Sequence, residues 1–145
     1  GLMPMRPLKL DSIDPLKLLV PSARNSLRPR IDDAIRHGQI VVERRIANAS
    51  LSAGLEFLSL TDWSSILPCW IALRELGNPR LTINPIVSPA LDVAVELIHP
   101  ARHPLSSPAR KLFDYVQQEL RTVEGEWRRV VGEDLSADDR KLKKK

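Results

Sequence analysis

The residues most able to do chemistry in this chain are hydroxyl and amide side chains that precede helical patterns. Ser50 stands before an apolar segment that contains Leu51, Leu55 and Leu58 on one helical face, and Asn48 lies two residues earlier. A serine at this position caps a helix by accepting a hydrogen bond from a first-turn amide. A capped helix N-terminus beside a polar loop favours a small anion, but a role as cap alone also explains the serine.

Motifs for catalysis or metal binding are absent from the sequence. There is no Gly-rich phosphate loop, no H-E-x-x-H, no pair of cysteines and no G-x-S-x-G. His37, His99 and His103 are far apart. His37 fits a role at a helix C-terminus or on the surface, and the neighbourhood of His99 and His103 offers no further metal ligands. We therefore expect no enzyme, no catalytic residues, no metal and no cofactor.

The bulk composition is that of a globular protein with one domain. The chain has 145 residues, and its net charge of +4 is dominated by five lysines and arginines at positions 140–145, without which the charge is −1. No apolar run approaches the ~18 residues of a membrane helix, and no signal peptide is visible. Cys69 is the only cysteine, which fits a reducing compartment. These features predict a cytoplasmic protein with no membrane partner.

Alternating strand and helix patterns predict an α/β fold with helices on both faces of a sheet. The apolar run Leu16–Val20 is typical of a central strand, and the next segment predicts a helix capped by Ser26 and closed by a left-handed Gly38. The period-two pattern of Ile40–Ala47 predicts a strand. Further strands are expected at Ser65–Leu67, Arg80–Ile83 and Leu91–Ile98, a loop or short helix at Pro68–Leu76, and a last helix capped by Ser107 with Pro108 at its first position.

The chain is expected to divide into four parts. Residues 1–15 form an irregular segment, 16–98 an α/β lobe with a returning strand, 99–131 a C-terminal helix, and 132–145 a flexible basic tail. The last helix carries more apolar residues than a small domain needs, which indicates an interface with a partner helix or second subunit. The stripe consists of Leu112, Phe113, Val116, Leu120, Val123, Trp127 and Val130.

Three segments together carry a family resemblance. Leu16–Ser22 followed by Ser26–Arg28 is a strand, a polar loop and an Arg-containing helix. The stretch Ile46–Trp70 is a strand end, a capped apolar helix and a strand ending in Leu-Pro. Leu91–Pro100 followed by Leu105–Ala109 is a strand and a Leu-Ser-Ser-Pro-Ala helix start. In this order the segments resemble the second lobe of the effector-binding domain of LysR-type transcriptional regulators.

The resemblance implies a periplasmic-binding-protein-like (type 2) subdomain with a mixed sheet flanked by helices. It implies that a small, anionic effector modulates promoter binding by the full-length oligomer. Promoter DNA would be a partner only through an N-terminal helix-turn-helix, which has no counterpart in this sequence. The family's Gly-x-Gly exit from the central helix is replaced here by Thr61-Asp62-Trp63. The positions that match effector-binding groups are Ser22, Arg24, Asn25, Ser26, Asn48, Ser50, Ser65 and Pro68.

An interaction module that uses the long last helix is the main alternative. In that hypothesis the chain is free-standing and Trp127 contributes to the working surface. A transport-type solute-binding protein and an α/β transferase fragment are weaker alternatives, because neither a signal peptide nor a catalytic constellation is visible.

Overall fold

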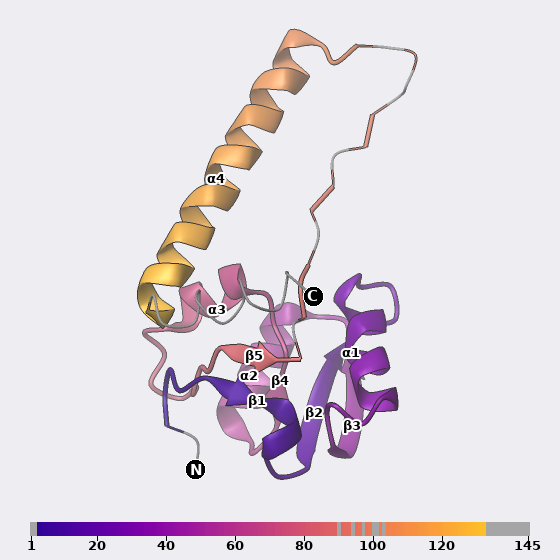
Figure 1. The fold of residues 1–145 in the computed structure, drawn as a ribbon, viewed down its shortest axis with the longest axis vertical. Coiled ribbons are helices and arrows are strands. Elements are labelled where there is room, and N and C mark those ends of the chain that lie inside the picture. The colour runs from indigo at the N-terminus through magenta and orange to yellow at the C-terminus, as the bar shows by residue number, and fades with distance from the viewer. Residues whose placement is uncertain are drawn as a thin grey trace, which may run out of the picture. The chain divides into compact units, whose positions relative to one another are not determined.

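The computed structural model describes residues 3–89, 91–93, 95–96, 98–99, 102 and 104–132. Its elements fall into two compact units, residues 1–93 and 94–145. Figure 1 shows the elements in chain order. They are β1 (Leu8–Lys9), the 3-10 turn η1 (Leu10–Ser12), β2 (Leu16–Pro21), α1 (Leu27–Arg36), β3 (Val42–Asn48), α2 (Leu51–Leu60), β4 (Ser64–Ser65), α3 (Cys69–Glu75), β5 (Ile86–Ser88) and α4 (Ser107–Val131).

Strand β2 is the centre of the first unit. It lies between β3 and β4 in a three-stranded sheet in which both pairings are parallel. A second, two-stranded sheet pairs β1 with β5, again in parallel. The strand pairs of the described residues are thus all parallel, whereas the resemblance implied a mixed sheet. Parallel neighbours need crossover connections, which α1 and α2 supply.

The two faces of β2 pack on different helices. Leu18 and Val20 are almost fully buried and belong to one apolar cluster with Ile31 of α1. Leu19, which points to the other face, lies beside Gly54 of α2. This agrees with the topology, because the crossover from β2 to β3 and the crossover from β3 past β2 to β4 run in opposite directions. Right-handed crossovers in opposite directions place their helices on opposite faces of the sheet.

The predicted first strand and first helix are confirmed, and Ser26 is the N-cap residue as expected, but its hydroxyl does not make the capping hydrogen bond. Gly38 has a positive φ of 70°, as a left-handed helix end requires. Ser26 is already helical and its side chain makes no capping hydrogen bond. Instead the Asn25 side-chain oxygen accepts from the Leu27 amide at 2.9 Å. Asparagine makes this bond to the backbone two residues ahead more readily than serine does.

Two predicted strands are wrong in the described residues. Residues 80–83 are irregular, because Pro79 and Pro85 supply no amide hydrogen to a ladder, and regular pairing starts only at Ile86. The described residues of 91–98 include no strand, and Ile98 is 89% exposed. Strand β3 begins at Val42, two residues later than predicted, and the ambiguous segment 68–76 contains the helix α3.

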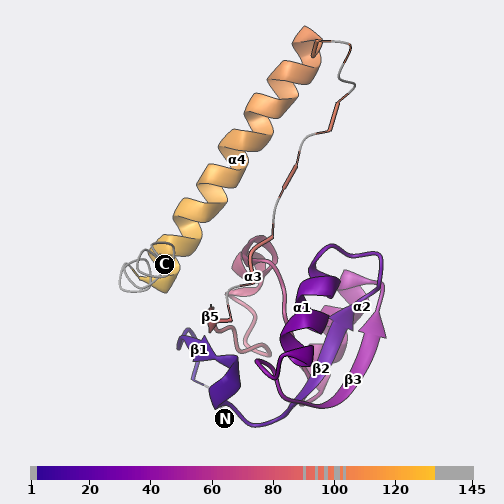
Figure 2. The same ribbon diagram turned by 45° about the vertical axis from the view of Figure 1, so that its right-hand side comes forward.

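The second unit contains α4, a continuous helix of 25 residues (Figure 2). The predicted cap is displaced by one residue, since the Ser106 hydroxyl accepts from the Ala109 amide at 3.4 Å and Ser107 is the first helical residue. Pro108 is tolerated there because first-turn amides need no intrahelical acceptor. The predicted flexible tail, apart from Gly132, lies outside the described residues.

Candidate functional site

A cavity of about 310 Å³ opens at the carboxyl ends of the three-stranded sheet. Strand β2 ends at Pro21, β3 at Asn48 and β4 at Ser65, and all three residues line the cavity. Strand order reverses beside β2, and open α/β sheets bind ligands at such a reversal, beyond the carboxyl ends of the strands. The volume is at the lower end of the range for small-molecule pockets.

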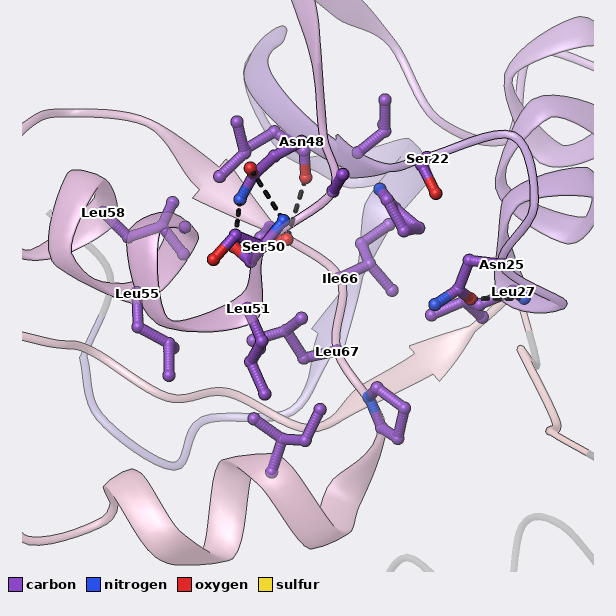
Figure 3. A pocket seen from close by; sticks show the side chains of 18 of the residues that line it. Ser22, Asn25, Leu27, Asn48, Ser50, Leu51, Leu55, Leu58, Ile66 and Leu67 are labelled. Carbon is purple, nitrogen blue, oxygen red and sulfur yellow. Dashed lines mark hydrogen bonds between the residues drawn. The ribbon is translucent and has the colours of Figure 1, made fainter.

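One end of the cavity is a polar corner built by the β3–α2 connection (Figure 3). The Asn48 side chain donates to the Ser50 carbonyl at 2.5 Å and accepts from the Ser50 amide at 3.1 Å. The Ser50 hydroxyl accepts from the Ala53 amide at 3.4 Å, which confirms the predicted cap of α2. The corner therefore presents a fixed amide, a hydroxyl and the first turn of a helix.

The opposite end is formed by the loop between β2 and α1 (Figure 3). Ser22, Asn25 and Ser26 line the cavity there. Within the described part of the chain, the hydroxyls of Ser22 and Ser26 and the amide NH2 of Asn25 make no hydrogen bond, so each can bind a ligand. Arg28 fixes the loop by donating from Nη1 to the Pro21 carbonyl at 2.9 Å.

Arg28 is itself held by Asp32. Its Nε donates to the Asp32 carboxylate at 2.8 Å, and Arg45 of β3 donates to the other carboxylate oxygen, also at 2.8 Å. The guanidinium is thus anchored between a strand end and a carboxylate on its own helix. This arrangement stiffens the cavity rim and leaves Arg28 outside the cavity lining.

The floor and the remaining wall of the cavity are mostly apolar. Ser65 donates its hydroxyl hydrogen to the Leu19 carbonyl at 2.8 Å, which leaves its oxygen able to accept, and Pro68 lines the cavity beside it. The wall comes from α2, from the β4–α3 connection, from α3 and from the segment after β5. Its members are Leu51, Leu55, Leu58, Ile66, Leu67, Trp70, Ile71 and Val93.

The described residues that line the cavity include no ionisable side chain. Seven of the eight positions predicted for effector binding line it, and Arg24 does not. The charge that the described lining contributes is therefore the partial positive charge of helix N-termini, which the first-turn amides of α2 provide.

The exit of α2 is built without glycine. The Thr61 hydroxyl donates to the Phe57 carbonyl at 2.8 Å, and the Trp63 ring packs edge-to-face on Phe57 with centroids 5.7 Å apart. Asp62 binds the Lys17 ammonium at 2.6 Å. That hydrogen bond holds the pKa of Asp62 below its ordinary value, with a smaller opposing effect of desolvation.

The apolar wall is the part of the site that sequence reasoning missed. Leu51, Leu55 and Leu58 were recognised as one face of a helix, but a stripe that lines a cavity has the same spacing as a stripe that lies in a core. Leu51 is 48% exposed, which distinguishes the two cases only once the structure is known. Trp70 and Ile71 gave no signal, because their segment was ambiguous between loop and helix.

The described residues contain neither a cluster of metal ligands nor a helix that could span a membrane. In that part of the chain no three His, Cys, Asp or Glu side chains come together as a possible metal site. None of its helices has the length and apolarity that crossing a bilayer requires.

A parallel α/β sheet with a ligand-sized cavity at its carboxyl edge defines a small-molecule-binding domain. The family model for the LysR substrate binding domain matches residues 4–121, most of the chain, so the chain belongs to this family. The family's fold is the type 2 periplasmic-binding-protein-like fold, and its members belong to transcriptional regulators rather than enzymes. No curated protein and no solved structure matches the chain significantly.

Proposed function

We propose that this chain is the effector-sensing part of a LysR-type transcriptional regulator and that the effector occupies the cavity at the carboxyl edge of the sheet. The chain would correspond to the second effector lobe with its last helix. Ligand binding would modulate the affinity of the full-length oligomer for promoter DNA. The observation that carries the proposal is the convergence of seven expected positions, six of them polar and the seventh Pro68, on one cavity inside the family match.

The chemistry of the lining restricts the ligand. A multiply charged ligand would lose its hydration without gaining a charged partner, which is costly in a half-apolar cavity. A single carboxylate is compatible with the Ser50 corner, because helix N-termini stabilise one negative charge. The leucines of α2 and Trp70 would cover an apolar body. We therefore propose a small monocarboxylate with an aliphatic or aromatic body.

A ligand panel tests this class. The full chain is titrated with medium-chain and aromatic monocarboxylates, acetate, dicarboxylates and phosphate esters, and binding is read from Trp70 fluorescence and from the thermal midpoint. We expect the apolar monocarboxylates to bind most tightly and to raise the midpoint. Tightest binding of dicarboxylates or phosphate esters by the folded chain would contradict the proposed class.

Ser22 offers a variant that separates ligand contact from structure. Its hydroxyl makes no hydrogen bond within the described residues, so Ser22→Ala should leave the thermal midpoint unchanged. The variant should weaken binding about two- to tenfold, the effect of one lost hydrogen bond. Ser59→Ala is the matched control, because Ser59 lies outside the cavity and its hydroxyl donates to the Glu56 carbonyl. Equal affinities of Ser22→Ala and Ser59→Ala for the ligand would argue against the proposed site. A Trp70→Phe variant shows whether the fluorescence change on binding comes from Trp70.

A further inference from the structure

The apolar stripe of α4 has the spacing of a coiled coil. From Ala109 to Val130, apolar residues recur at alternating intervals of four and three. This is the a/d pattern of a heptad repeat, which places one seam along a helix. The family match stops at residue 121, so the second half of the seam lies beyond it. The a positions are Phe113, Leu120 and Trp127, and the d positions are Ala109, Val116, Val123 and Val130.

The seam is accessible in α4. The helix has no buried residue among its 25, and Leu120 and Val130 on the seam are 36% and 41% exposed. Val116 is 41% exposed, and the other seam positions, Ala109, Phe113, Val123 and Trp127, are half-buried. A row of apolar residues that includes no buried member is typical of a protein interface.

Side-chain size selects the direction of pairing. Every a position holds a large residue and every d position a small one. In a parallel pair, each a or d residue meets its own equivalent in the other helix. Trp127 would then meet Trp127, and the small valines at the d positions would meet each other and leave a gap. In an antiparallel pair, a residues meet d residues, and each layer then combines a large and a small side chain. Constant layer volume is what close packing requires.

Charge selects the register. When Ala109 of one copy lies opposite Trp127 of the other, Phe113 meets Val123 and Val116 meets Leu120. The flanking e positions then bring Arg110 of each copy beside Glu124 of the other, while Glu119 meets only its own equivalent. A shift by one heptad that sets Phe113 opposite Val130 removes both attractions and sets Glu119 against Glu126 twice. The shift in the other direction, which sets Ala109 opposite Leu120, also removes both attractions and leaves only four apolar layers instead of six. Parallel pairing sets Glu119 against Glu124 twice.

We infer that α4 is a self-association helix that pairs antiparallel with α4 of a second copy of this chain, in the register that sets Ala109 opposite Trp127. The occupant is a second copy because the size and charge patterns of the helix complement themselves. The inference does not depend on the ligand cavity. The proposed pairing buries the apolar seam from Ala109 to Trp127 on both helices.

Sedimentation equilibrium of the full chain tests the pairing with two variants, each of which neutralises one charged side chain of α4. Arg110→Gln removes two attractive contacts per dimer, and Glu119→Gln removes the like-charge contact. We expect Arg110→Gln to weaken the dimer about two- to tenfold, because two exposed charge pairs are lost. We expect Glu119→Gln to tighten the dimer less, up to about fivefold, because only one contact between like charges is removed. Changes of the dimer dissociation constant in the same direction for both variants would overturn the inference. A chain that is monomeric at every concentration, because its seam packs within its own chain, would also overturn it.

A cysteine at position 117 tests the register. In this arrangement Gln117 lies beside Gln117 of the second copy, so Gln117→Cys in a Cys69→Ser background should form a covalent dimer in a glutathione redox buffer. Gln118→Cys, one residue further on the outer face, is the control. It should form no covalent dimer and should run as a monomer on both reducing and non-reducing denaturing gels. Cross-linking of Trp127→Cys to itself without cross-linking of Gln117→Cys would establish parallel pairing and overturn the inference. Gly125→Ala, on the outer face, should leave the dimer intact.

Discussion

Gly54 sets how closely α2 approaches the sheet. It is the buried residue of α2, and a Cβ atom there would lie 2.5 Å from the Asn48 amide nitrogen and 3.4 Å from a Leu19 methyl. The Asn48 amide in turn holds the Ser50 corner through two hydrogen bonds. Because Gly54 has no Cβ atom, the Asn48 side chain can occupy this space and form the polar end of the cavity.

Gly54→Ala should weaken ligand binding without unfolding the chain. The new methyl group displaces the Asn48 side chain and so disturbs the Ser50 corner. A ligand that binds at this corner should lose about one hydrogen bond, which is roughly a fivefold loss of affinity. Alanine is the better helix former by about 1 kcal/mol, which offsets the packing cost in the stability of the fold.

The matched control for this substitution is Gly77→Ala. No atom lies within 4 Å of a Cβ at Gly77, so the same methyl group should be accepted there. Titrating both variants with the tightest monocarboxylate of the panel distinguishes them. Unchanged affinity of Gly54→Ala would show that the Asn48–Ser50 corner does not contact the ligand.

Among the elements, the exit of α2 replaces glycine by a set of side-chain contacts. Thr61 ends the helix in an extended conformation. Its hydroxyl donates a hydrogen bond to the Phe57 carbonyl, which the end of the helix leaves without an amide partner. Lys17 of β2 then binds Asp62 across 45 residues of sequence. The helix end is therefore attached to the central strand by a charge pair and by the contact between Phe57 and Trp63.

The Lys17–Asp62 pair predicts a specific pH dependence. Because the folded state lowers the pKa of Asp62, the pair stabilises the fold above the ordinary aspartate pKa of about 4, and this contribution is lost as the pH falls through the lowered value. The difference in thermal midpoint between the wild-type chain and Asp62→Asn should thus be constant near neutral pH and shrink below about pH 4.

The effect should be small, because the Asp62 side chain is 71% exposed, and salt should reduce it further. Asp92→Asn, an equal change of charge on an exposed residue, is the control and should show no such convergence. A difference that grows as the pH falls would contradict the assignment of the lowered pKa to a stabilising contact.

At the scale of the whole molecule, the two candidate functions occupy different units. All described lining residues of the cavity belong to residues 1–93, whereas the heptad seam belongs to residues 94–145. The family match reaches residue 121 and so includes the first half of the seam only. Effector binding and self-association should therefore be separable.

Truncation after Leu120 should separate them. The shortened chain keeps the cavity and should bind the preferred monocarboxylate with unchanged affinity. It loses Val123 and Trp127, and with them four of the six layers of the proposed antiparallel pair, so it should sediment as a monomer. Titration and sedimentation of the same sample measure both properties. A truncated chain that still dimerises would locate self-association elsewhere.

Much of the fold follows from local signals. The apolar run of β2, the left-handed Gly38 and the Ser50 cap each depend on a few adjacent residues, and the structure confirms them. Ser26 is the N-cap residue but its hydroxyl does not cap, and the cap expected at Ser107 is Ser106, because neighbouring polar residues compete for the same amides. In the described residues the strands expected at 80–83 and 91–98 were wrong, because a strand also needs a partner, which local sequence does not specify.

The polar positions of the candidate site were reached through family resemblance, and the tertiary structure decided what surrounds them. Sequence alone determined the types of the residues, the α/β pattern and the heptad spacing of the last helix, because these depend on near neighbours along the chain. Only the tertiary structure decided that the leucines of α2 line a cavity, that Arg24 lies outside it, and that Asp32 and Asp62 bind Arg45 and Lys17. The physical reason is that burial and charge pairing arise between segments that meet only when the chain folds.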